Sequence, residues 1–313
     1  MKTKPVQPNH PRTPKLASIL VPTDFSRHAT RALQYAVPLA QQVGGKITLL
    51  HAIDMPVVPA QLGALMTDEA RLTAAAQSGL DQLAARLVPN PLLGPTVVRL
   101  GRAYEEISRA AKSRKIDLIV LAMRGRTELQ RALLGSTAER VVRHASCPVL
   151  TVRPVRGRKM PAAGSKDLAA LINRILVPVD FSAHSRAVVR YAAGLARTTQ
   201  AGLALLHVVE PPPLGVFAGH EAESTRYITG AHTTARQELA RLATSMCGDL
   251  EVEVLVREGH PAQGIALAAR DWRSDLIVLS TRGLTGLRHI VLGSTAEAVV
   301  RHAPCPVLTV GRT

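Results

Sequence analysis

The sequence predicts an α/β protein of two successive domains, each a five-stranded parallel sheet with helices on both faces. Short apolar runs alternate with helix-period stretches along both halves of the 313-residue chain, as repeated βαβ units require. These runs are apolar throughout, which is typical of strands buried on both faces of a parallel sheet. An internal repeat indicates that the second half is built like the first.

The repeat is clearest at the end of each half. Residues 135–153 read GSTAERVVRHASCPVLTVR and residues 293–311 read GSTAEAVVRHAPCPVLTVG, identical at sixteen of nineteen positions. Two long copies exclude a solenoid, which stacks more and shorter units. We therefore predict one domain over 16–153 and another over 171–313. A basic linker over 154–170 separates them, and a disordered basic tail over 1–15 precedes them.

The first expected element is a buried strand over Ser18–Val21, followed by Ser26 as a helix N-cap signal. That helix should run to about Val43, where Gly44-Gly45 ends it. The other first-half strands are expected at Lys46–Ile53, Thr96–Arg99, Asp117–Met123 and Pro148–Val152. The other first-half helices are expected at Thr67–Leu87, Ala103–Ser113 and Ser136–His144. The second-half strands are expected at Arg174–Val179, Gly202–Val209, Glu251–Val256, Asp275–Ser280 and Pro306–Val310.

Composition excludes several classes of protein. The cysteines Cys147, Cys247 and Cys305 are odd in number and widely spaced, so neither a disulfide framework nor a zinc knuckle is indicated. The first fifteen residues contain four prolines and no apolar run, unlike a secretory signal. No apolar stretch is long enough for a transmembrane helix. We expect a cytoplasmic protein without membrane insertion.

The net charge of +16 raises the question of a nucleic-acid partner. Aromatic residues make up only 3% of the chain, so stacking platforms for single strands are scarce. Basic residues gather partly in the tail and in the Arg153–Lys166 segment, where flexible chain tolerates charge without a function. We therefore do not expect nucleic-acid binding.

Matched polar and glycine residues follow the strands in both halves. Asp24 and Asp180 come after the first strand of each half, and Ala52 and Val208 end the second. An Arg-Gly pair, nine residues and a Gly-Ser pair follow the fourth. Ligands of such sheets bind at the carboxyl ends of the strands, near the point where the strand order reverses. These residues are therefore the candidate site.

The motifs resemble those of the universal stress protein family. In the first half they are VPTDFS at 21–26, LLHA at 49–52 and RG-x9-GSTAE at 124–139; in the second, VPVDFS at 177–182, LLHV at 205–208 and the matching GST segment. The resemblance covers nearly the whole chain outside the tail and linker. It implies two Rossmann-like or flavodoxin-like domains arranged as a pseudo-dimer, paired through their fifth strands.

Part of that family has an ATP-binding pattern, Gly-x2-Gly-x9-Gly-Ser/Thr. Glycines let backbone N–H groups approach a polyphosphate, and the start of the following helix points further donors at it. The resemblance implies ATP or ADP as ligand, with Mg²⁺ left open. It places the following residues around the nucleotide: Asp24, Ala52, Ala122, Gly125, Gly135 and Ser136 in the first half, and Asp180, Val208, Ser280, Gly283, Gly293 and Ser294 in the second.

The chain departs from the pattern at its leading glycine, which is Ala122 in one half and Ser280 in the other. If that position required a positive φ, each substitution would cost about 1 kcal/mol or more. The glycines have an alternative role as tight turns. Asp24 and Asp180 could instead cap the first helix or bond the loop, and Ser136 and Ser294 could be helix N-caps only.

No nucleophile elbow, Cys/His dyad, P-loop lysine or metal-binding histidine spacing stands out in the sequence. We therefore expect a stress-response regulatory protein that is not an enzyme, with at most slow, incidental ATP hydrolysis. It would act through conformational or partner coupling, with its protein partners unknown and further association of whole chains left open. The alternative is an interaction protein of the same fold that works without nucleotide.

Overall fold

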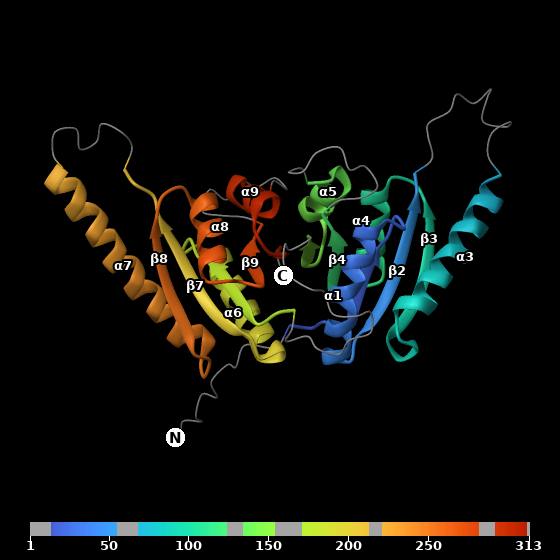
Figure 1. Cartoon of the computed structure of the whole chain (residues 1–313), viewed down its shortest axis with the longest axis horizontal. Coiled ribbons are helices and arrows are strands. Elements are labelled where there is room, and N and C mark those ends of the chain that lie inside the picture. The colour runs from blue at the N-terminus through green and yellow to red at the C-terminus, as the bar shows by residue number, and fades with distance from the viewer. Residues whose placement is uncertain are drawn as a thin grey trace, which may run out of the picture.

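The computed structural model describes residues 14–54, 68–123, 134–153, 171–212, 221–281 and 292–311. Its centre is one ten-stranded sheet with the order β3-β2-β1-β4-β5-β10-β9-β6-β7-β8 (Figure 1). Neighbouring strands of this sheet are parallel, except that β5 and β10 pair antiparallel and join the two halves. The predicted pair of parallel-sheet domains in a pseudo-dimer is confirmed.

The first half contains β1 (Ser18–Pro22), α1 (Arg27–Val43), β2 (Lys46–Ile53), α3 (Glu69–Leu87), a 3-10 turn (Asn90–Leu92), β3 (Leu93–Leu100), α4 (Ala103–Ser113), β4 (Leu118–Ala122), α5 (Ser136–His144) and β5 (Val149–Val152). The second half contains β6 (Arg174–Pro178), α6 (Ala183–Thr199), β7 (Gly202–Val209), α7 (Glu221–Cys247), β8 (Val252–Glu258), α8 (Pro261–Asp271), β9 (Leu276–Ser280), α9 (Ser294–His302) and β10 (Val307–Val310).

Local sequence signals explain the first helix of each half. The Ser26 hydroxyl accepts a hydrogen bond from the Ala29 N–H at 3.1 Å and caps α1, as predicted. Gly44 ends α1 in the left-handed conformation with φ 66°. Ser182 caps α6 in the same way. The C-terminal end of α6 differs, because the residue in the left-handed conformation is Gln200, with φ 56°, and not a glycine.

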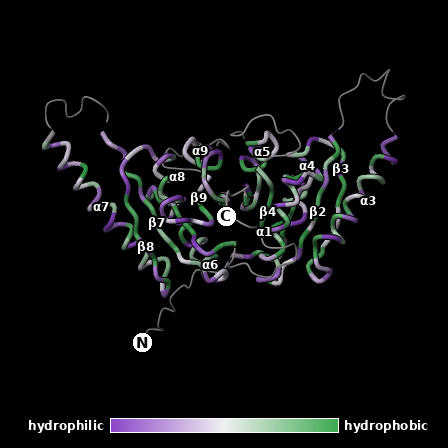
Figure 2. The backbone as a smooth tube through the Cα atoms, viewed as in Figure 1, coloured by the Kyte–Doolittle hydropathy of each residue, from purple (hydrophilic) through white to green (hydrophobic). Residues whose placement is uncertain are grey.

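Helices cover both faces of the sheet. Helices α1, α3, α6 and α7 pack on one face, and α4, α5, α8 and α9 pack on the other. Each apolar cluster draws residues from both halves, so the core continues across the junction. Figure 2 shows the apolar strands in the interior, while α3 and α7 lie at the outer ends of the sheet with mixed polar and apolar character.

The junction combines strand pairing with buried hydroxyls and a cluster of ion pairs. The Thr151 Oγ1 donates to the Val307 carbonyl at 3.0 Å, and the Thr309 Oγ1 donates to the Val149 carbonyl at 3.2 Å. Beside the strands, two arginines and two glutamates of α5 and α9 form four ion pairs of 2.9–3.7 Å, which we call the junction quartet: Glu139, Arg143, Glu297 and Arg301. This cluster connects the two helices that carry the Gly-Ser motifs.

Candidate functional site

Each half has one place where the strand order reverses. The chain runs from β1 outward to β2 and β3, and then returns to β4 on the other side of β1. The second half repeats this order around β6 and β9. The carboxyl ends of β1 and β4, or of β6 and β9, therefore diverge into a crevice, which is the usual ligand position in such sheets.

The turn after the first strand of each half has a strained backbone. Phe25 has φ 63° and Phe181 has φ 62°, which is unusual for a bulky side chain and costs about 1–3 kcal/mol. The Asp24 Oδ1 accepts a hydrogen bond from the Ser26 N–H at 2.9 Å, and the Asp180 Oδ1 accepts one from Ser182 at 3.0 Å. One oxygen of each aspartate therefore holds the turn, so the structural role considered for both residues is real.

The matched histidines fasten this turn to the second strand. The His51 Nδ1 lies 2.8 Å from the Thr23 carbonyl, and the His207 Nδ1 lies 2.7 Å from the Val179 carbonyl. A carbonyl only accepts, so Nδ1 carries the proton in both rings. Each ring packs on the strained phenylalanine, with centroids 4.5 Å and 4.6 Å apart. His207 forms part of the crevice wall in the second half.

The helices after the fourth strands begin without a side-chain cap among the described residues. Gly135 and Gly293 are the N-caps, and neither helix has a capping side-chain hydrogen bond. Ser136 and Ser294 are the first helical residues, so their interpretation as N-caps is wrong. The first N–H groups of α5 and α9 are therefore donors that a ligand can use.

The substituted leading position of the glycine pattern does not strain the backbone. Ala122 and Ser280 are the last residues of β4 and β9, and neither is among the described residues with positive φ. The cost foreseen for a positive φ therefore does not arise. Gly125 and Gly283, the next glycines of the pattern, lie outside the described residues.

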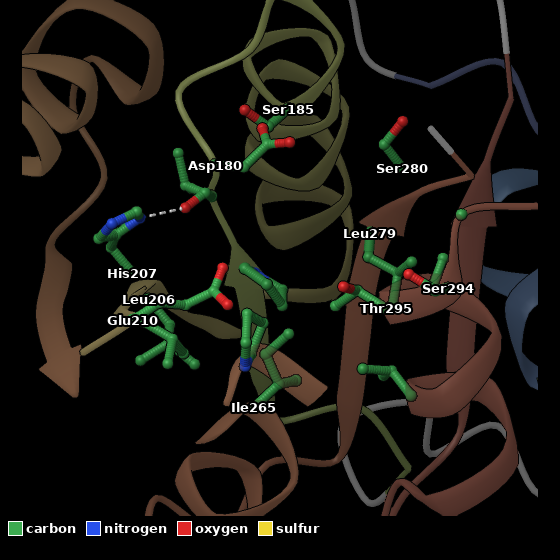
Figure 3. Close-up of a pocket in the computed structure, with 17 residues that line it drawn as sticks. Asp180, Ser185, Leu206, His207, Glu210, Ile265, Leu279, Ser280, Ser294 and Thr295 are labelled. Carbon is green, nitrogen blue, oxygen red and sulfur yellow. Dashed lines mark hydrogen bonds between the residues drawn. The ribbon is translucent and has the colours of Figure 1, made fainter. Parts of the chain in front are cut away.

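A cavity of about 350 Å³ occupies the crevice of the second half (Figure 3). Asp180 and His207 lie on one side of it, and Ser294 and Thr295 lie on the other. The described residues around it are Pro178, Val179, Asp180, Ser185, Leu206, His207, Val208, Glu210, Pro261, Ile265, Leu279, Ser280, Gly293, Ser294, Thr295, Ala296 and Val299. All predicted second-half site residues except the undescribed Gly283 thus come together around one cavity.

The first half has a cavity of about 340 Å³ with a different lining. The described residues around it are Asp54, Arg102, Ala103, Tyr104, Ser136, Thr137 and Arg140. Of the predicted first-half residues, Ser136 lines this cavity. Asp24, Ala52, Ala122 and Gly135 lie at the same places in the fold as their second-half counterparts, but not in this lining.

Sequence reasoning missed several lining residues. Asp54 and Glu210 follow the second strand in matched positions, and this pairing of acids could have identified them. Arg102, Tyr104 and Arg140 have no matching residue type in the second half, so a search for repeated residues passes over them.

The two halves pack the floor of the crevice with side chains of different size, and the larger one lies on the strand in the second half and on the helix in the first half. Val208 in the second half faces Gly264 of α8, where an added Cβ would lie only 2.8 Å and 2.9 Å from the two Val208 methyls. The first half has the smaller Ala52 and the larger Glu106 at these positions. Glu106 is buried, lies against Gly101 and pairs with Arg109.

Ionisation shifts lie away from the two cavities. Burial, with the negative charge of Asp117 as the second cause, raises the pKa of the Cys147 thiol to about 12. Burial likewise raises the pKa of Cys247 to about 11. Within the described ranges, no cluster of His, Cys, Asp and Glu has the make-up of a metal site. None of the helices in those ranges has the length and apolar character needed to cross a bilayer.

Fold and crevices together define a chain of two fused, doubly wound α/β domains with a ligand-sized cavity in each. A model of the universal stress protein family matches residues 16–153 and again residues 172–311. The chain belongs to the universal stress protein family and is a tandem member of it.

Individual relatives agree with this assignment. A universal stress protein of Mycolicibacterium smegmatis is 27% identical over 304 residues, covering 93% of this chain and 96% of the relative. One of Methanocaldococcus jannaschii is 35% identical over 143 residues, covering 45% of this chain and 82% of the relative. The crystal structure of a universal stress protein from Archaeoglobus fulgidus covers 96% of this chain and 100% of its own, with a TM-score of 0.67 at 22% identity, and so shares the fold.

Proposed function

We propose that this protein binds an adenine nucleotide, ATP or ADP, in one or both crevices and works as a stress-response regulator rather than as an enzyme. The observation that carries the proposal is the second-half cavity. There the uncapped N-terminus of α9, with Ser294 and Thr295, faces Asp180 and His207 across a space of about 350 Å³.

The two sides of this cavity fit the two ends of a nucleotide. The α9 N-terminus offers backbone N–H groups, two hydroxyls and the positive end of a helix dipole, which suit phosphate oxygens. The lining also includes the apolar side chains of Val208 and Ile265, which suit a flat ring, and polar groups such as Asp180 and His207. A volume of about 350 Å³ lies within the usual range for small-molecule sites.

In the second half, the proposed role is binding and not turnover. Among the described lining residues of the second half there is no lysine or arginine to neutralise a leaving phosphate. One oxygen of Asp180 is already engaged by the turn. Occupancy would instead act on the α5 and α9 helices, which the junction quartet connects.

Titration calorimetry with Mg-ATP on the full chain tests the proposal. Ser136→Tyr and Ser294→Tyr place a large side chain at an exposed first helical residue and should fill one crevice each. Ser245→Tyr, on the exposed face of α7, is the matched control. We expect saturable binding to the wild type and the control, and loss of binding in the double crevice variant. No heat with the wild type would overturn the proposal, and unchanged binding in the double variant would overturn the site.

A second candidate is a nucleotide-independent interaction protein. This candidate is favoured because the matched residues already have a structural role. Hydrogen bonds of Asp24, Asp180, His51 and His207 hold the turn after the first strand of each half. Partners captured equally with and without ATP would support it. Partners whose capture requires ATP would refute it.

A further inference from the structure

The two crevices differ in charge. At matched positions the first half has Arg102, Tyr104 and Arg140 where the second has His260, Ala262 and Ala298. The acids Asp24 and Asp54 have the counterparts Asp180 and Glu210. Glu105, beside Arg102, has the neutral counterpart Gln263. Over these positions the first half therefore carries two positive and three negative charges, whereas the second half carries two negative charges and no positive one.

The sequence segments that connect the fourth strand of each half to the next helix do not cancel this difference. Residues 124–133 contain three arginines and one glutamate, and residues 282–291 contain two arginines and no acid, so each segment carries a net charge of +2. The charge difference between the two crevices therefore comes from the residues around the first-half cavity and not from these segments.

Contacts within the first half position both arginines. The Arg140 guanidinium lies over the Tyr104 ring, 4.9 Å from its centroid, and the Tyr104 hydroxyl donates to Glu105 at 2.7 Å. The Arg102 Nη1 lies 3.9 Å from the same glutamate. Both arginines are among the residues that line the cavity of about 340 Å³, together with the hydroxyl-bearing residues Ser136 and Thr137.

Backbone donors add to these side chains. The cavity lies between the N-termini of α4 and α5, and neither helix has a capping side-chain bond among the described residues. The second half differs here too, because α8 starts with Pro261, which has no N–H to donate, whereas α4 starts with Ala103.

From this cavity we propose that the first half contains a polyphosphate subsite, in which Arg102 and Arg140 bind the phosphates and Tyr104 positions Arg140. The inference rests on the proposed nucleotide binding and names its specificity. The first half selects nucleotides with two or three phosphates over a monophosphate, and the second half discriminates less. Guanidinium groups bind phosphate oxygens through paired, charge-assisted hydrogen bonds, so affinity should rise with phosphate number.

The test measures the affinity ratio of ATP to AMP in each half of the full chain. Ser294→Tyr leaves the first crevice for titration, and Ser136→Tyr leaves the second. In the Ser294→Tyr background, Arg102→Ala with Arg140→Ala should weaken ATP binding by about tenfold or more and AMP binding by less than about threefold. Arg241→Ala on α7, which removes one exposed positive charge elsewhere, should change neither.

A graft and a positioning variant sharpen the test. His260→Arg with Ala298→Arg, in the Ser136→Tyr background, should raise the ATP-to-AMP ratio of the second half by about threefold or more. Tyr104→Leu should lower the ratio of the first half less than Arg140→Ala does, because the arginine remains without its ring. Inorganic tripolyphosphate should compete with ATP in the first half, which separates binding of the phosphate chain from binding of the base.

Each outcome decides the inference. A first-half ratio that falls in the arginine variant, together with competition by tripolyphosphate, supports it. An unchanged ratio with ATP still bound overturns the subsite and leaves nucleotide binding standing. Failure of the wild type to bind ATP, ADP or AMP overturns both the subsite and the proposed function.

Discussion

Replacing Gly264 with alanine tests the packing of the second-half crevice floor. The new Cβ would lie 2.8 Å and 2.9 Å from the two methyls of Val208, about 1 Å inside ordinary carbon contact. Val208 is β-branched and cannot swing away freely. Such overpacking costs about 1–3 kcal/mol. Because alanine is about 1 kcal/mol better than glycine inside a helix, the net change in the free energy of unfolding should be a loss of about 0–2 kcal/mol.

Gly230 of α7 supplies the matched control, because an added Cβ there meets nothing within 4 Å. Gly230→Ala should stabilise the protein by up to about 1 kcal/mol. The assay is urea unfolding followed by the fluorescence of Trp272, the single tryptophan, which directly follows α8 and reports on the second half. Gly264→Ala should therefore unfold about 1–3 kcal/mol more easily than Gly230→Ala.

A double-mutant cycle with Val208→Ala completes the test. This change recreates the alanine found at position 52 and removes the two methyls that the new Cβ would strike. The double variant should be more stable than the sum of the single effects by about 1–3 kcal/mol. Equal stabilisation by Gly264→Ala and Gly230→Ala, or additive effects in the cycle, would refute the reasoning.

Three further predictions concern the junction and the thiols. Arg143→Ala with Arg301→Ala should lower the free energy of unfolding by about 1–2 kcal/mol, because it leaves the junction-quartet glutamates, each about 30% exposed, without their ion-pair partners. In urea denaturation, this loss should become smaller when salt is added. Thr151→Val should cost about 1 kcal/mol in the same assay through its buried hydrogen bond, and a neutral result would contradict that bond. The pKa of Cys147 is raised from the ordinary value of 9.0 to about 12 in the folded protein. The neutral thiol therefore contributes fully to the free energy of unfolding below about pH 9, and this contribution is lost as the pH rises towards 12. Stability measured from pH 8 to 11 should thus fall less steeply in Cys147→Ala than in the wild type, and parallel curves would contradict the shift.

Most of the fold follows from local sequence signals. The apolar runs, the Ser26 cap and the Gly44 end predict β1, α1 and β2 closely, because each depends on neighbouring residues. Strand β3 is longer than expected, running over Leu93–Leu100, because Gly94-Pro95 interrupts its pattern while tertiary pairing with β2 still holds it extended. The pairing of β5 with β10 was implied by the family resemblance and is confirmed.

The candidate site was predictable only where the two halves agree. Matched residues such as Asp180 and Ser294 pointed to the second-half cavity, and the structure brings them together. Arg102 is the N-cap of α4 and Arg140 lies on α5, and only the packing of α4 beside α5 places both at one cavity. Their absence from the second half concealed them from a search for repeats, although this difference is what distinguishes the two crevices.

A crystal structure of the full chain grown with Mg-ATP tests the central claim most directly. We expect phosphate density at the N-terminus of α5, of α9 or of both, within hydrogen-bond distance of the Ser136 or Ser294 N–H. In an occupied second half, the base should lie beside Val208. Crevices that stay empty at millimolar ATP, or a nucleotide held elsewhere on the protein, would contradict it.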